Sequence, residues 1–312
     1  MYNEALKEKF IQQRNKSIND QMQCRCIFER IERFEEAWGA DICTRSSKEL
    51  KPVLELVCNA QSEWSRLYIL KAYCKWCLND IDYPDACDGI FHVKLSGFEE
   101  TKRKMVANPL DLQRCLNAIF KPESDHTIDN IYRCFFWLAF SGIPEEEALD
   151  ITVDEVNLID MTIIHNGVEY ELYRESFKSI RICTTSDWFS RQHPLYHAII
   201  KKPRGDSNQL LRGFGDRIST QAIRTAVSLA LRNTESKRAI SYNRVWLSGV
   251  FYRIHEDEVI TGVPRFDGFL DDFMRGKEYK LGPGRSSAKT VRKEKLNLIT
   301  KRYERWKVAF NY

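Results

Sequence analysis

Long apolar runs are missing from this sequence of 312 residues. No stretch approaches the roughly 18 consecutive apolar residues of a membrane-spanning helix, and the first 20 residues lack the apolar core of a signal peptide. Hydrophobic residues nevertheless make up 43% of the chain, which excludes a disordered protein. We therefore expect a folded cytoplasmic protein with no membrane partner, and the length favours two domains.

Complete metal-binding motifs are also missing. Cys74 and Cys77 form a CxxC pair inside a segment with helical periodicity, but no second CxxC follows. His193 and His197 lack a third histidine or a neighbouring carboxylate. Without a secretion signal, the ten cysteines are expected to be reduced, and most of them to be buried as small apolar side chains. A zinc site at the CxxC pair is the weaker alternative, so we predict neither a metal nor a cofactor.

Acidic residues are scarce at one end of the chain. Residues 273–312 contain 12 Lys and Arg against 3 acids, whereas the other 272 residues contain 36 basic and 41 acidic residues. The net charges are therefore +9 and −5. A basic end on a slightly acidic body indicates contact with a polyanion or an exposed helix that binds a partner.

The N-terminal part has helical patterning throughout. Apolar residues at three- and four-residue spacing predict four helices, over 2–17, 21–38, 47–60 and 62–80. Ser46 or Ser47 is placed to cap the third of them. We expect residues 1–85 to form a small helical bundle, and the break in the pattern over 86–108 to be a linker.

The rest of the chain, residues 109–312, is predicted as a second helical domain with a small sheet. An apolar helix ends at Gly142, and Pro144 with three glutamates is predicted to begin the next one. Alternating residues around Asn166-Gly167 predict a hairpin, with "SIRICTT" (179–185) as a third strand. Further helices are predicted over 187–202, 217–233, 241–256, 266–279 and 287–310. The fold class is thus mainly α with one small three-stranded antiparallel sheet.

Two blocks carry a family resemblance. "FFWLAFSGIPEEEALDITVDEVNLIDMTI" (135–163) and "ISYNRVWLSGVFYRI" (240–254) lie on either side of the predicted sheet. In order and pattern, over almost the whole chain, the sequence resembles the tyrosine recombinase (phage integrase) family. The resemblance implies an N-terminal core-binding-like domain that contacts DNA and a C-terminal catalytic-like domain.

The catalytic residues that the resemblance implies are mostly absent. The family uses a tyrosine nucleophile, two arginines, a His or Trp, and a lysine, because negative charge develops on the phosphate oxygens. Pro144 stands at the first arginine position and Ser241 at a histidine position, and only Arg244 is retained. No His or Trp lies within 276–284 and no tyrosine within 290–294. Tyr279 precedes the nucleophile position and Tyr303 follows it.

The resemblance therefore implies a recombinase fold without enzymatic activity. What remains is a protein that clamps double-stranded DNA. We expect a sequence-specific repressor of a prophage that controls lysogeny. It would act at operators in the host nucleoid. A monomer or weak oligomer is expected; a protein or peptide antagonist fits regulation, although no residue argues for one. The alternatives are an active recombinase using Tyr279 or Tyr303, and a helical adaptor that binds protein partners.

The predicted DNA contacts are basic or hydroxyl side chains. Lys178 is the first candidate for the family's hairpin lysine and Arg174 the second, while Arg244 either binds a phosphate or pairs with the 145–147 glutamates. The full set is Arg45, Ser47, Lys48, Arg66, Lys71, Arg174, Lys178, Arg244, Arg285, Lys289, Arg292, Lys293 and Lys295.

Overall fold

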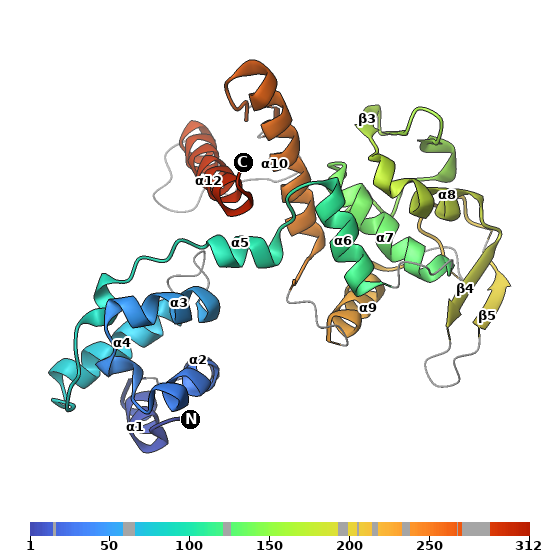
Figure 1. Ribbon diagram of the computed structural model, residues 1–312. Helices are drawn as coiled ribbons and strands as arrows, with labels where there is room; N and C mark the ends of the chain where they lie inside the picture. Colours follow the sequence, from blue (N-terminus) through green and yellow to red (C-terminus); the bar gives the residue numbers. More distant parts are fainter. Residues whose placement is uncertain are drawn as a thin grey trace. The chain divides into compact units, whose positions relative to one another are not determined.

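The chain forms two compact units, Met1–Thr101 and Lys102–Tyr312. The computed structural model (Figure 1) describes residues 1–14, 17–58, 66–120, 126–192, 199–204, 206–213, 218–232, 238–266, 268–269 and 288–312. Among these residues, no helix is both long enough and apolar enough to cross a membrane. Both units are mainly helical, and the second also contains the strands.

The first unit is a bundle of four helices. They are α1 (Glu4–Arg14), α2 (Ile18–Trp38), α3 (Ser47–Val57) and α4 (Arg66–Asn79), with short 3-10 turns at Ile42–Thr44 and Gly89–His92. Ser46 caps α3, because its backbone N–H donates to Glu49 Oε2 at 3.0 Å and its hydroxyl accepts from the Glu49 N–H. The predicted cap is therefore confirmed at Ser46.

Aromatic rings from three helices fill this bundle. Phe10, Phe28, Tyr73 and Trp76 lie with ring centroids 5.0–6.3 Å apart. The Tyr73 hydroxyl donates to Asp41 Oδ2 at 2.8 Å, which satisfies its one buried polar group. Trp76, like most of the cysteines, belongs to the core, as the patterning predicts.

An ion pair lies wholly inside the first unit. The Lys7 ammonium donates to Glu35, and both side chains have no exposed surface. Burial raises the pKa of Glu35 to about 7, although the neighbouring Lys7 cation lowers it. The same carboxylate accepts the Ile42 N–H at 3.0 Å, so it joins α1, α2 and the turn after α2.

Residues 86–108 contribute to both cores. Ile90 and Val93 pack in the first core, while Met105 and Val106 pack in the second. Between them α5 (Phe98–Lys104) is helical. The segment predicted as a linker thus carries its own anchors on each side.

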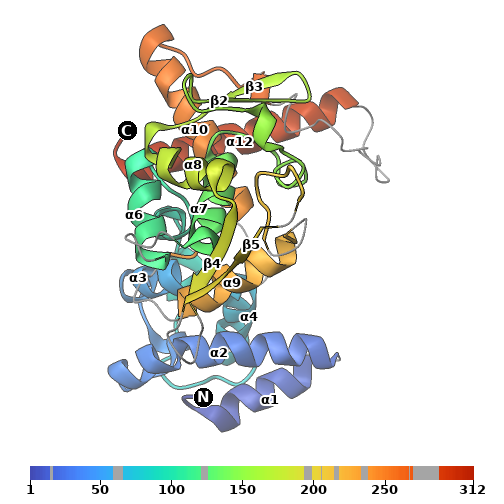
Figure 2. The same cartoon turned by 90° about the vertical axis from the view of Figure 1, so that its right-hand side faces the viewer.

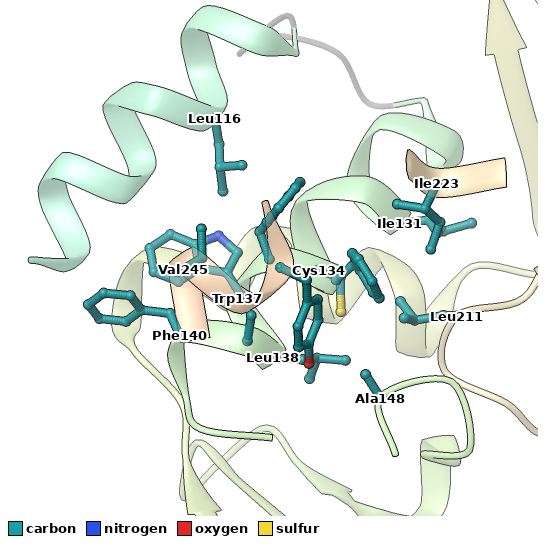
Figure 3. Packing of buried hydrophobic residues seen from close by; sticks show 14 of the residues in the cluster. Leu116, Ile131, Cys134, Trp137, Leu138, Phe140, Ala148, Leu211, Ile223 and Val245 are labelled. Atoms are coloured by element: carbon teal, nitrogen blue, oxygen red, sulfur yellow. The ribbon is translucent and has the colours of Figure 1, made fainter. Parts of the chain in front are cut away.

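The second unit is built around α7. Its helices are α6 (Pro109–Ile119), α7 (Thr127–Phe140), α8 (Phe177–Thr185), α9 (Thr220–Arg232), α10 (Tyr242–Thr261) and α12 (Ala288–Phe310). Leu116 of α6, Ile223 of α9 and Val245 of α10 converge on the buried α7, as Figure 3 shows. All but one of the last eleven residues of α7 are buried, so this helix organises the unit.

The close approach of α10 to α7 depends on Gly249. A Cβ atom at this position would overlap the carbonyl oxygen of Phe140 and lie 2.7 Å from its carbon. No other residue type fits there without moving a helix.

A three-stranded antiparallel sheet is present, as predicted. It consists of β1 (Val156–Asn157), β2 (Thr162–His165) and β3 (Val168–Glu171) in the order β1-β2-β3. The β2–β3 turn is at Asn166-Gly167, where both residues have positive φ, as the hairpin signal predicts. A second, two-stranded sheet pairs β4 (Trp188–Gln192) with β5 (Ile199–Pro203) and is visible beside α8 in Figure 2.

Three predicted elements are wrong. Residues 179–185 belong to helix α8, because Ile180 and Cys183 are buried at a three-residue spacing, and β1 supplies the third strand instead. Residues 187–202 were predicted to be helical, but their described part forms β4 and β5. These strands are rich in aromatic and β-branched residues, which favour strands. The segment after Pro144 consists of turns, such as Glu147 N–H to Pro144 O at 3.1 Å. Most of the helix predicted over 266–279 lies outside the described residues.

Candidate nucleic-acid interface

The turn after α7 is stabilised by an arginine from another helix. Gly142 has a φ of +102°, and a Cβ there would lie 2.6 Å from Arg253 Nη2. Arg253 Nη1 donates to the Phe140 carbonyl at 2.7 Å, which satisfies one of the last carbonyls of α7. Arg253, from α10, is therefore a cap on the turn that holds Pro144.

The first turn of α10 is bonded to the same turn. Tyr242 donates its hydroxyl to the Ile143 carbonyl at 2.9 Å, and Trp246 Nε1 donates to the Gly142 carbonyl at 2.8 Å. Ser241 is the exposed N-cap residue of α10, and Arg244 lies in the first turn, half-buried. The structure thus brings the two sequence blocks, with Pro144, Ser241 and Arg244, to one place in the fold.

The acidic turn pairs with α9. Glu145 Oε1 accepts from Arg224 Nε at 3.1 Å and from Arg224 Nη2 at 2.6 Å. The ion pair found for Glu145 is therefore with Arg224, a residue that the sequence analysis did not consider. Both residues of this ion pair line a pocket of about 490 Å³ between α7, α9 and the start of α10. Ser241 also lines this pocket, whose walls are largely apolar, including Phe135, Ile223 and Val227.

Helix α12 packs against α10 through an apolar stripe. The cluster between them contains Leu247, Val250, Phe251, Ile254, Ile299, Tyr303 and Trp306. Trp306 Nε1 also donates to the Val106 carbonyl at 2.9 Å, which ties the helix to the start of the unit. The described part of the basic end, α12, thus contributes to the core of the second unit along this stripe.

Tyr303 is buried in that stripe. Its side chain is 0% exposed, its ring lies among Phe251, Phe266 and Trp306, and its hydroxyl donates to Glu258. Burial, followed by the bond to Glu258, raises the pKa of the phenol. The hydroxyl is therefore enclosed by protein in this structure. Tyr279 lies outside the described residues.

Arg302 sits beside two other arginines. It is half-buried, and its Nε has no hydrogen-bond partner among the described residues. Burial lowers the pKa of Arg302, and the nearby cations of Arg244 and Arg305 lower it further. Arg244 of the second block therefore lies close to the basic flank of α12.

The predicted contacts in the first unit differ in their partners. Arg45 Nη1 donates to Glu49 at 3.3 Å and its guanidinium lies 6.0 Å from the Trp38 ring centroid. Arg66 Nη1 donates to the Val57 carbonyl at 3.4 Å. Lys48 is exposed on α3, whereas Ser47 and Lys71 are half-buried.

The remaining predicted contacts are on the second unit. Arg174 and Lys178 are exposed, but Lys178 lies in the first turn of α8, so its predicted place on a hairpin is wrong. On α12, Arg292 and Lys293 are exposed and Lys295 is half-buried. Arg285 and the side chain of Lys289 lie outside the described residues.

The cysteines do not assemble into a metal centre in the part of the chain that the structure describes. All ten are free thiols, and Cys74 and Cys77 are buried. Over the same residues, no group of three or more His, Cys, Asp or Glu side chains is arranged to hold a metal ion.

Arg224, Arg253, Arg302 and Arg305 are the site residues that the predicted set of contacts lacks. The three-residue spacing of Arg302 and Arg305, flanking the apolar stripe of α12, was a usable sequence signal. Arg253 and Arg224 carry no such signal, since their partners are distant in the sequence.

Comparison with known proteins matches the first unit to a family. The model of the MrpR N-terminal core-binding domain matches residues 1–79, which confirms the predicted core-binding-like domain. Among solved structures, the Tn1549 transposon integrase (residues 82–397), in complex with circular intermediate DNA, is similar at 13% identity and a TM-score of 0.35. That match covers 93% of this chain and 98% of the integrase chain. No curated protein matches.

Proposed function

We propose that this protein is a sequence-specific, double-stranded-DNA-binding transcriptional repressor of a prophage. In this proposal it has the layout of a tyrosine recombinase without the catalytic activity, and it controls the choice between lysis and lysogeny by occupying operators. The observation that carries the proposal is the state of the degenerate centre. Pro144, Ser241 and the buried Tyr303 offer no strand-cleaving chemistry, while Arg244 and the basic face of α12 remain.

Loss of cleavage follows from what phosphoryl transfer requires. Removing even one group that stabilises developing charge costs about 10²–10³ in rate in well-studied enzymes. Here a proline replaces the first arginine, a serine replaces the histidine, and the nearest described tyrosine downstream is bonded to Glu258. Arg253, the arginine that approaches the first-block turn, donates to a backbone carbonyl.

Binding to DNA is supported by the first unit and by the charge distribution. The core-binding-domain match covers α1 to α4, which carry Ser47, Lys48, Arg66 and Lys71, and the turn before α3, which carries Arg45. Residues 273–312 carry 12 basic residues against 3 acidic ones. In this proposal the lysines and arginines bind backbone phosphates and side chains on α3 and α4 read base edges.

The regulatory part of the proposal rests on a finer resemblance. We infer a resemblance to the master repressor of SPβ-type Bacillus prophages from the integrase-like layout, the proline in place of arginine, and the "SGVFYRI" block. Repression then consists of operator occupancy in the host nucleoid by a monomer or weak oligomer. A protein or peptide antagonist is the kind of partner that would release it.

Genomic footprinting on the host's prophage tests this function. We expect protection of a small set of related sites, and gel-shift affinity for those sites that falls steeply with salt. Duplexes with the same base composition in scrambled order are the control. Binding with no sequence preference and no dependence on salt would instead indicate a helical adaptor that binds protein partners.

A further inference from the structure

The two flanks of α12 differ in how their charges are neutralised. On one flank Lys307 donates to Glu258 at 2.9 Å and lies 3.3 Å from Glu304. On the other flank lie Arg302 and Arg305, three residues apart on the helix. No ion pair with a carboxylate is found for either arginine within the described residues.

Arg302 occupies an unfavourable environment in the free protein. Its side chain is half-buried beside α10, and its Nε is buried without a hydrogen-bond partner among the described residues. Arg244 and Arg305 are near enough for their charges to depress the pKa of Arg302. Like charges held together, with a buried donor unsatisfied, destabilise a fold unless something else compensates.

A phosphate group has the negative charge and the acceptor oxygens that Arg302 and Arg305 do not find in a carboxylate among the described residues. Guanidinium groups donate parallel N–H bonds to phosphate oxygens, and they remain charged even when partly buried. Two of the three arginines are on α12 and the third is in the first turn of α10, which converge through the Leu247–Tyr303–Trp306 packing. The cluster is therefore fixed by two packed helices rather than by loops.

We propose that Arg302 and Arg305 of α12, together with Arg244 of α10, form a clamp that binds one backbone phosphate of DNA. This inference rests on the proposed function and adds two residues that neither the sequence blocks nor the family match supplies. In the degenerate centre, α12 thus contributes cations where Pro144 contributes none. The same chemistry could hold free inorganic phosphate, so the test must separate the two sources.

Charge-removing variants of α12 test the clamp in the full-length chain. We compare Arg302→Gln and Arg305→Gln with Lys301→Gln, which removes one charge from an exposed position on the same helix. Binding to a labelled duplex of the protected sequence is measured over a salt series. Each arginine variant should weaken binding at least tenfold beyond the Lys301→Gln control. The slope of log affinity against log salt should become shallower by about 0.9 for each phosphate that the variant no longer neutralises.

Thermal unfolding with and without inorganic phosphate reports on the cluster independently of DNA. Phosphate should raise the Tm of the wild type. In phosphate-free buffer, the Tm of Arg302→Gln should be no lower than that of the wild type. Added phosphate should leave the Tm of Arg302→Gln unchanged. Arg302→Lys, which keeps the charge, should retain part of both responses. It also guards against a folding defect in the glutamine variant.

The outcomes separate this inference from the proposed function. If the wild type binds the protected sequence and the arginine variants behave like Lys301→Gln, the clamp is wrong and the repressor proposal stands. If phosphate stabilises the wild type alone while DNA binding is unchanged in the variants, the cluster holds free phosphate, which overturns the DNA contact. If the wild type shows no sequence-specific binding at all, the proposed function itself fails.

Discussion

At the scale of single residues, Pro144 matters for both the local backbone and the proposed function. The proline ring is compatible with the turns that follow α7. The Phe140 carbonyl at the end of α7 accepts a hydrogen bond from the Arg253 guanidinium of α10. The fold therefore does not depend on an arginine from the turn itself. In the proposed alignment with the recombinase family, Pro144 stands where a cleaving enzyme would direct an arginine at a phosphate.

Restoring that arginine should not restore activity. In Pro144→Arg, Ser241 still replaces the histidine and Tyr303 remains buried against Glu258. We expect no covalent protein–DNA adduct when this variant is incubated with a nicked duplex and resolved under denaturing conditions. An adduct from this single variant would show that the block assignments are wrong.

The buried Lys7–Glu35 pair gives a prediction about stability. In Lys7→Met the Glu35 carboxylate loses its partner in a dry site, which typically costs about 3–5 kcal/mol. The double variant Lys7→Met/Glu35→Leu should recover part of this loss, because no charge is then left buried without a partner, while the Ile42 N–H still loses its acceptor. Chemical denaturation gives the free energies of unfolding; a single variant as stable as the wild type would contradict the prediction.

The same carboxyl makes the stability depend on pH. Burial raises the pKa of Glu35 from 4.5 to about 7, so the folded state binds more protons than the unfolded state between these values. The contribution of Glu35 to the free energy of unfolding must therefore fall as the pH rises from about 4.5 to 7. Unfolding curves over this range should show a smaller decline for the double variant than for the wild type. Equal slopes would mean that Glu35 is ionised normally.

At the scale of elements, the contact between α7 and α10 holds the turn that contains Pro144 against the start of α10, which carries Ser241 and Arg244. Gly249→Ala places a methyl group inside the Phe140 carbonyl, which must displace one of the helices. We expect a loss of about 3 kcal/mol, at the upper end of overpacking costs. Gly262→Ala, at the end of α10 with φ +77° and open space around it, is the matched control and should cost about 1 kcal/mol. Denaturation midpoints that rank the two variants the other way would contradict this packing.

Helices were predictable from the sequence where one face is buried over several turns. The bundle helices and α10 begin and end within a few residues of the predicted bounds, because their periodicity is unambiguous. Short segments were not: 179–185 alternates like a strand, yet Ile180 and Cys183 pack as one face of α8. In such short segments, packing against neighbouring elements determines whether a strand or a helix forms, and the local sequence pattern carries no information about that packing.

The candidate site divides along the same line. Pro144, Ser241 and Arg244 were singled out by their offsets inside two sequence blocks, and the structure bonds these blocks together through Tyr242 and Trp246. Arg302 could not be placed beside Arg244, since their proximity depends on how α12 packs against α10 across more than fifty residues. Arg253 escaped for the same reason, because its acceptor lies 113 residues away.

At the scale of the whole molecule, the positive charge is concentrated at one end of the chain. The chain as a whole is only +4, yet its last forty residues carry +9, and part of that segment is the packed helix α12. A solvated tail would show the same composition without the apolar stripe of Ile299, Tyr303 and Trp306. The described part of this positive end, α12, is thus a structured surface of the second unit, which suits a phosphate backbone better than a diffuse attraction does.

The central claim, DNA recognition without strand cleavage, is tested most directly on a nicked duplex that carries the footprinted sequence. The protein is incubated with this trap, and the products are resolved in parallel on native and denaturing gels. We predict a sequence-specific, salt-sensitive complex on the native gel and no adduct on the denaturing gel. A covalent adduct that disappears in Tyr279→Phe or Tyr303→Phe would contradict the account and make the protein an active recombinase.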